Sequence, residues 1–436
     1  MKVKMQTPDH DEGSSAPTAV PERNFSLKHA EKTVLETIDG LGLAALLTDL
    51  SAKAESTAVK CTLIRPDGSL PPEAEGLGKG TQQEARVGAL FEALEHMHFG
   101  PEGPDLEQAK VLRVSDFLNT DADSVPAPVL DILTEQQEAN MAVVTYDLLE
   151  QEHQIQVPLG LVAPWYVEDT EKRIRANLGD DFYYGSLMRY TTSSGAAIGI
   201  GTSEALLHGL NESIERDDFS LFLAQTFFNA PGTRHSFRVV DPATFPPKIA
   251  RAMMEVSALR RAPVHLLDIS GSFGPRTLVA YVEPSGDFKN HRRGVGSSMS
   301  FSHAAWRAIS ELVQTLLHTP QDEEAELLSG LAHVPEIHRC ATFDLTPYMA
   351  SAPATHFEQD DPTRLSVDAQ VKELSGALFA GNIRVATRAI RTFDSGISVL
   401  HTYSPDLETF MLVCGGCLVP PGPRAVSAIS SAPSAR

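Results

Sequence analysis

The chain has 436 residues, a formal net charge of −21 and 42% hydrophobic residues, which allows two or three average domains or one large fold built by duplication. The acidic balance argues against binding to the phosphate backbone of nucleic acids and suits a protein whose acids are balanced by metal ions. No signal-peptide segment and no run of about 18 apolar residues is present. We therefore expect a cytoplasmic protein that binds neither nucleic acid nor membrane.

The N-terminal part is predicted to pass from a disordered arm into a helix and then a hairpin. Residues 1–24 are polar and rich in Pro, Ser and Asp, which is typical of disorder. From Ser26 the spacing of apolar residues predicts a helix that ends at a glycine near position 40. Residues 58–64 alternate as in a β-strand, and Pro66-Asp67-Gly68 predicts the turn of a hairpin.

A glycine-rich segment follows at residues 76–81 and is expected to be a loop. Its lysine, Lys79, is a candidate phosphate contact. The segment is not a Walker A motif, because the lysine is followed by glycine and the upstream glycine is missing.

A predicted helix over residues 82–99 carries three glutamates on one face. Glu92 and Glu95 follow Glu84 by 8 and 11 residues, and on an α-helix these offsets return to within about 80° of the starting direction. The apolar neighbours of these acids indicate that the face is not fully solvated.

The middle of the chain contains two expected strands, a loop and a second helix. Residues 142–149 and 154–162 have the pattern of short strands. Residues 190–201 are small and are expected to form a loop whose backbone can approach a ligand closely. A helix over residues 203–225 follows directly.

This second helix repeats the glutamate spacing of the first, with Glu204, Glu212 and Glu215 at the matching positions. Acids that cannot reach water need a counter-charge, and carboxylates converging from two helices suit Mg²⁺, which commonly bridges protein acids to phosphates. Arg216 follows directly, and a guanidinium can hold phosphate through two hydrogen bonds. The residues alone leave a solvated acidic face open as the alternative.

The C-terminal half is expected to hold a strand pair at residues 263–270 and 277–284, a Gly/Ser loop at 292–300 and a helix over 302–318. Strands and helices follow one another along the chain without strict alternation, and this order predicts an α+β fold with mixed β-sheets.

Two further patterns lie in this half. Arg307 and Glu311 are four residues apart on the predicted helix, so they form either a phosphate or metal contact or an intrahelical salt bridge. Cys414 and Cys417 have metal or redox spacing, but without a second pair the packing of small side chains is the favoured interpretation. Residues 425–436 are predicted to be a flexible tail.

Three segments resemble the ATP-binding segments of the YcaO superfamily: GKGTQQEARVGALFEALEHM, SSGAAIGIGTSEALLHGLNESIERDD and SHAAWRAISELVQ. The resemblance implies a duplicated YcaO-type fold with flanking helices and an ATP-binding catalytic domain over residues 25–424. The Mg²⁺ ligands that it implies are Glu92, Glu95, Glu204, Glu212 and Glu215. The ATP contacts that it implies or suggests are Arg307, Glu311, Arg216, Lys79, Ser194 and, as a candidate lysine of the first helix, Lys28.

The same resemblance implies ATP- and Mg²⁺-dependent formation of thiazoline and oxazoline rings from Cys, Ser and Thr of a ribosomally made precursor peptide. It also suggests a separate leader-peptide-binding partner of the ubiquitin-activating-like kind, possible partnership with a flavin dehydrogenase, and a possible homodimer. A thioamide-forming or macroamidine-forming enzyme is a second hypothesis. Departures from the family pattern at Gly88, His96, Ser194 and Ile200 support a third, a non-catalytic scaffold. No catalytic base is identified.

Overall fold

The computed structural model confirms the α+β class and describes residues 22–50, 54–169, 172–233, 236–284, 293–318, 328–359 and 365–430. The strands of this described part form sheets of three, five and six strands. Strands β8 and β12 pair in parallel, and the other strand pairs of the described residues are antiparallel. No described helix is long and apolar enough to cross a membrane.

The three-stranded sheet belongs to the N-terminal part and packs mainly against the helix that follows its last strand. It has the order β1-β2-β3. The second strand and the turn after it were predicted, whereas the first strand was not and the residues of the third were expected to be a loop. The backbone N–H of Arg65 donates to the carbonyl of Ser69, and Gly68 has a positive φ of 83°, as a tight turn requires. The elements are α1 (Leu27–Gly40), β1 (Ala44–Asp49), β2 (Thr57–Ile64), β3 (Glu75–Gly80) and α2 (Gln82–Phe99).

The six-stranded sheet has the order β4-β5-β13-β14-β7, with β6 paired to β5. Its strands are β4 (Lys110–Arg113), β5 (Asn140–Leu148), β6 (Gln154–Pro158), β7 (Ala196–Ile200), β13 (Ala386–Thr392) and β14 (Ile397–Tyr403). The helices and short 3-10 turns that lie between α2 and β7 in the chain are α3 (Asp105–Gln108), α4 (Val114–Thr120), η1 (Ala122–Ser124), α5 (Ala127–Thr134), α6 (Leu159–Val162), α7 (Pro164–Val167), α8 (Arg173–Leu178), η2 (Tyr184–Ser186) and η3 (Met188–Tyr190).

The five-stranded sheet has the order β11-β10-β9-β8-β12. Its strands are β8 (Arg238–Val240), β9 (Val264–Asp268), β10 (Arg276–Val282), β11 (Arg293–Ser298) and β12 (Ala354–Thr355). The remaining elements of this half are η4 (Pro242–Thr244), α10 (Pro247–Arg260), α11 (Phe301–His318), α13 (Pro335–Thr342), α14 (Thr346–Met349), α15 (Val367–Ala380), η5 (Phe410–Gly415) and α16 (Pro423–Ser430).

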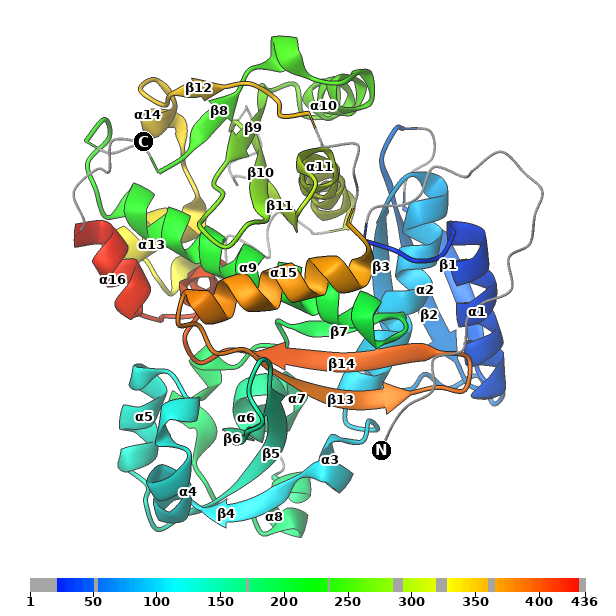
Figure 1. Cartoon of the computed structure of the whole chain (residues 1–436), viewed down its shortest axis with the longest axis vertical. Coiled ribbons are helices and arrows are strands. Elements are labelled where there is room, and N and C mark those ends of the chain that lie inside the picture. The colour runs from blue at the N-terminus through cyan, green and yellow to red at the C-terminus, as the bar shows by residue number, and fades with distance from the viewer. Residues whose placement is uncertain are drawn as a thin grey trace.

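The long helix α9 (Thr202–Phe227) joins these parts. It contacts β7 and β14 of the six-stranded sheet and β11 of the five-stranded sheet, and in Figure 1 it runs between the two. Figure 1 also shows α11 with the five-stranded sheet and α2 with the three-stranded sheet. The three helices that were predicted to carry the acids therefore meet where the sheets come together.

The three expected loops each contain a strand, which corrects the prediction for those residues, whereas residues 191–195 before β7 form no strand. These strands are β3, β7 and β11, each of which leads into the helix that follows it. A Cβ on Gly78 would lie 1.7 Å from the carbonyl oxygen of Ala85, and a Cβ on Gly296 would lie 2.5 Å from that of Ala304. Glycine is required here because helix backbone packs directly on strand backbone, not because the chain turns.

The predicted tail is also partly wrong. Helix α16 includes residues 423–430, with Ala425 fully buried and the guanidinium of Arg424 2.6 Å from Oδ2 of Asp217 on α9. At the other end, Glu22 is buried although it falls within the predicted arm. The rest of the arm, residues 1–21, and the end of the tail, residues 431–436, lie outside the described residues.

Candidate nucleotide and metal site

Carboxylates from α2, α9 and α11 gather where these helices meet. Burial, followed by the charges of Glu92 and Glu212, raises the pKa of Glu95 well above its ordinary value. Burial likewise raises the pKa of Glu215, and the nearby charge of Glu311 raises it further. The charge of Glu212 on α9 thus acts on Glu95 of α2, which indicates that these acids of the two helices lie near one another.

Burial also raises the pKa of Glu92, against the opposing charges of His96 and Lys79. The ring Nε2 of His96 lies 3.7 Å from Oε1 of Glu92, and its Nδ1 lies 2.8 Å from the carbonyl oxygen of Glu75. The histidine that follows the first acid pair is thus held beside the acids.

Three cations face this acidic cluster. Nζ of Lys79 on β3 donates to Oε2 of Glu311 over 2.6 Å. Arg216 is 3.2 Å from Glu212 and 3.6 Å from Glu215. Burial lowers the pKa of Arg216, but the two glutamates outweigh it and raise the net value.

Arg307 on α11 completes the group of cations. Its Nη2 lies 4.0 Å from Oε2 of Glu215. Arg307 therefore pairs with an acid of α9 and not with Glu311 on its own helix. Burial raises the pKa of Glu311, but Lys79 and Arg216 outweigh it and hold the value below the ordinary range. The intrahelical salt bridge considered from the sequence is therefore replaced by contacts between elements.

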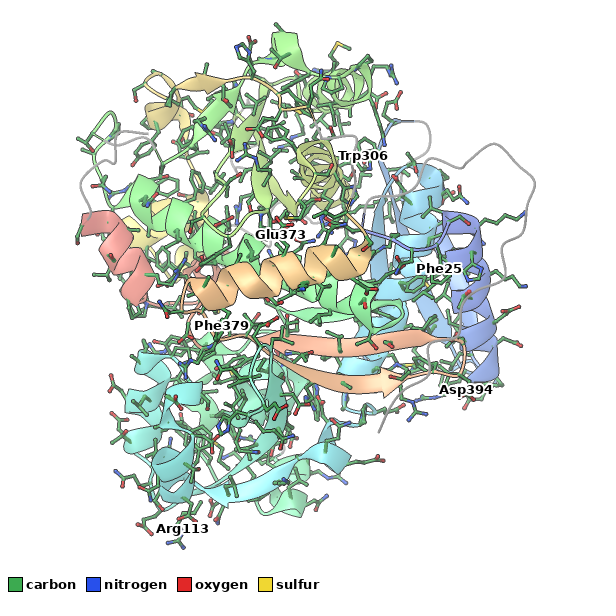
Figure 2. All side chains as sticks on the ribbon, viewed as in Figure 1. Phe25, Arg113, Trp306, Glu373, Phe379 and Asp394 are labelled. Carbon is green, nitrogen blue, oxygen red and sulfur yellow. The ribbon has the colours of Figure 1, made fainter. Side chains whose placement is uncertain are left out.

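Glu204 has a different setting from the other acids. It lies in the first turn of α9, where its Oε2 accepts the backbone N–H of Ile200 at 3.2 Å and its Oε1 accepts that of Asn24 at 2.5 Å. Its counterpart in the first repeat, Glu84, caps α2 with Thr81 and accepts the indole N–H of Trp306 at 3.0 Å. Trp306 is labelled in Figure 2 on the side of α11 toward α2.

The buried polar atoms of the cluster fit a bound cation and phosphate. Among the described residues, Oε2 of Glu215, Nε of Arg216 and Nε of Arg307 are buried without a hydrogen-bond partner. Uncompensated buried polar atoms are costly. Among the residues that the structure describes, no group of three or more Asp, Glu, His or Cys side chains is arranged closely enough to hold a metal ion. Phosphate oxygens of a bound nucleotide commonly supply further ligands to Mg²⁺.

Two predicted contacts lie apart from the acids. Ser194 is in the turn before β7, where its hydroxyl is 2.8 Å from that of Thr192, and Lys28 is exposed on α1. Their roles in nucleotide binding stay predictions.

Sequence reasoning missed residues that approach the site from other directions. Glu22 is 4.0 Å from Arg307, and the charge of Arg23 acts on Glu95 and His208. Burial, then the charges of Arg307 and Arg23, holds the pKa of His208 well below its ordinary value, which keeps the ring neutral. Glu22 and Arg23 belong to no periodic pattern, and composition alone assigned them to the predicted disordered arm.

A cavity of about 310 Å³ adjoins the cluster. Arg216 and Glu311 line one part of it, and Phe219, Val295 and Met411 give it apolar walls. Both cysteines of the Cys414-Gly-Gly-Cys417 segment line it as well, in η5 and the turn after it. Cys414 and Cys417 are not joined by a disulfide, and the segment forms a wall of the cavity.

Comparisons with solved structures support the fold. A heterocyclase in complex with substrate and cofactor has a TM-score of 0.61 at 15% identity, over 89% of this chain and 54% of the heterocyclase. This chain therefore spans about half the length of that protein. YcaO from Methanopyrus kandleri, bound with AMPPCP and Mg²⁺, has a TM-score of 0.61 at 17% identity, over 91% of this chain and 95% of that one. The E. coli microcin synthetase McbBCD complex has a TM-score of 0.52 at 13% identity, over 84% and 88%.

Sequence comparisons give the family. A protein of Methanothermobacter thermautotrophicus, described as uncharacterized, is 24% identical over 375 residues, which is 80% of this chain and 85% of its own. The family model described as YcaO cyclodehydratase, ATP- and Mg²⁺-binding, matches residues 77–408. The chain thus belongs to the YcaO cyclodehydratase family, and its cofactors are ATP and Mg²⁺.

Proposed function

We propose that this chain activates backbone amides of a ribosomally synthesised precursor peptide and closes thiazoline or oxazoline rings on Cys, Ser or Thr. The observation that carries the proposal is the gathering of acids and cations from three helices beside the cavity that Arg216 and Glu311 line. A nucleotide held by the cluster would present its terminal phosphate toward this cavity, where the apolar walls suit a peptide segment.

The residues of the cluster have distinct tasks in this scheme. Bound ATP would supply a phosphoryl group that turns the amide oxygen into a leaving group, with Mg²⁺ neutralising the charge that builds up. Lys79, Arg216 and Arg307 hold phosphate oxygens in place. Glu92, Glu95, Glu212 and Glu215 are the proposed metal ligands. Glu204 stays a predicted fifth ligand, and its carboxylate ties the start of α9 to the segment that precedes α1.

The test is a reaction with purified protein, ATP, Mg²⁺ and the precursor peptide, together with a leader-binding partner where one is encoded nearby. We expect each ring to reduce the peptide mass by one water, in step with ATP turnover. Glu92→Gln and Glu212→Gln should abolish the loss, and Glu36→Gln on the exposed face of α1 is the matched control. ATP turnover without water loss would rule out ring formation.

A second candidate keeps the nucleotide site and changes the nucleophile. Cys414 and Cys417 line the same cavity as Arg216 and Glu311, and two cysteines at this cavity motivate a reaction that handles sulfur, such as thioamide formation. High-resolution mass spectrometry separates the two, because exchange of oxygen for sulfur increases the mass whereas ring closure reduces it. A macroamidine also loses one water, and fragmentation that locates the new bond distinguishes it from an azoline.

A non-catalytic scaffold is the third candidate, motivated by the family departures at Gly88, His96, Ser194 and Ile200. The double variant Glu92→Gln with Glu212→Gln tests it. Unchanged peptide processing by this variant would support the scaffold and exclude both reactions.

The remaining proposals concern organisation. We retain one ATP-binding domain over residues 25–424, extended by the helix at 423–430. We also retain a separate leader-binding partner of the ubiquitin-activating-like kind, a flavin dehydrogenase where rings are oxidised, and a homodimer. The likeness to chains of a microcin synthetase complex supports the search for partners, and the genes beside this one would identify them.

A further inference from the structure

The carboxylate of Glu22 contacts side chains near the proposed nucleotide site, including Arg307, which is expected to bind phosphate. Its side chain is 5% exposed, and it accepts a hydrogen bond from the hydroxyl of Ser298. Its Oε2 lies 3.6 Å from Nε2 of His303 and 4.0 Å from Nη1 of Arg307. A buried carboxylate needs such partners, so these contacts fix its position at the start of α11.

Arg307 is shared between two acids as a result. One terminal nitrogen faces Glu22 and the other faces Glu215, each at 4.0 Å. A phosphate that pairs with this guanidinium would therefore meet the carboxylate of Glu22 already in place. Two anions of the same sign at such a distance repel strongly when they are shielded from water.

The backbone beside Glu22 is anchored separately. The N–H of Asn24 donates to Glu204 over 2.5 Å, at the start of α9. Glu22 itself has a positive φ of 65°, which a residue with a side chain rarely adopts. The segment then passes through Phe25, labelled in Figure 2, into α1. Contacts with two helices thus hold a strained conformation that directs the carboxylate inward.

We propose that residues 22–24 are a built-in competitor of the nucleotide, with Glu22 in the place of a phosphate on Arg307. Binding of ATP and Mg²⁺ then requires this segment to leave, and the measured affinity is reduced by the fraction of molecules in which it is in place. The proposal rests on the nucleotide site and not on the peptide reaction, so both of its tests are made without peptide.

The first test is calorimetric titration of the full chain with AMPPCP and Mg²⁺. Glu22→Gln keeps the size of the side chain and removes its charge, and we expect it to tighten binding about tenfold or more, because a larger fraction of the molecules is open to nucleotide. Glu36→Gln, exposed on α1, should match the parent protein. Equal or weaker binding by Glu22→Gln would overturn the proposal, while no binding by any variant would instead refute the nucleotide site itself.

The second test follows the bond between Arg23 and Asn24, a trypsin site whose N–H is held by Glu204. We expect AMPPCP with Mg²⁺ to speed cleavage after Arg23, measured by mass spectrometry of the released peptide. Glu22→Gln should be cleaved faster than the parent without nucleotide. Protection of this bond by nucleotide would overturn the proposal, because the segment would then remain in place in the bound state.

Discussion

Nζ of Lys79 lies 2.6 Å from Oε2 of Glu311, although the two residues are 232 positions apart in the sequence. The lysine is on β3 beside α2, and the glutamate is on α11 beside β11. The glutamate also accepts the backbone N–H of Val295 at 3.3 Å. This ion pair joins two units, β3 with α2 and β11 with α11, each made of a glycine-containing strand and the helix that follows it. It lies at the edge of the proposed phosphate site.

Lys79→Ala should weaken AMPPCP binding at least about tenfold and reduce the free energy of unfolding by about 1–3 kcal/mol, because Glu311 loses its counter-charge. Titration calorimetry and denaturant unfolding measure the two effects. Lys60→Ala breaks the more exposed pair with Glu75 and should cost under about 1 kcal/mol without changing binding. Equal effects of the two variants would contradict the special position of Lys79.

The raised pKa of Glu95 makes stability depend on pH in a defined direction. Its pKa is well above the ordinary 4.5, so the folded state holds a proton that the unfolded state has lost, and the stability contributed by this group declines as pH rises through the folded value. Glu95→Gln should therefore gain free energy of unfolding relative to the parent as pH increases above about 4.5, measured without Mg²⁺. A difference that does not change with pH would refute the raised pKa.

Two glutamates of the first copy of the spacing, Glu84 and Glu92, should separate stability from binding. Glu84→Ala removes a capping-box carboxylate and the acceptor of Trp306, and we expect a loss of about 1–2 kcal/mol of stability with nucleotide affinity little changed. Glu92→Gln should have the opposite profile, with intact stability and weakened binding of AMPPCP and Mg²⁺. Thermal unfolding and calorimetry on both variants make the comparison, and a loss of binding in Glu84→Ala alone would exchange the roles.

Gly78 should tolerate no side chain. A Cβ there would lie 1.7 Å from the carbonyl oxygen of Ala85 and 2.3 Å from the N of Ala89, so Gly78→Ala should cost about 3 kcal/mol or more, or prevent folding. Gly376→Ala on α15 meets no heavy atom within 4 Å and should stabilise by about 0.5–1 kcal/mol. Denaturant midpoints of the two variants check the contrast.

The sequence was informative where the physics is local. Apolar spacing predicted α2 with the bounds that the structure has, residues 82–99, and α9 and α11 were located to within two residues at each end. The glutamate offsets predict which acids of one helix share a face, and in the structure the charges of Glu92 and Glu212 both act on Glu95.

The sequence was misleading where the outcome depends on distant parts of the chain. Glycines suggest loops locally, but Gly78 and Gly296 lie in strands because a helix packs against them. Nothing local in the polar N-terminal segment indicates that Glu22 reaches α11 or that Asn24 reaches α9. Helix α16 was likewise missed, since Arg424 finds its partner Asp217 only in the folded chain.

We propose that the acids and cations around Arg216 bind ATP and Mg²⁺ for the removal of water from a peptide amide. The most direct measurement is mass spectrometry of the precursor peptide after incubation with the protein, ATP, Mg²⁺ and the leader-binding partner, beside Glu92→Gln with Glu212→Gln. We predict loss of one water per ring with the parent protein and none with the double variant. Equal processing by both proteins, or ATP turnover with no change of peptide mass, would contradict it.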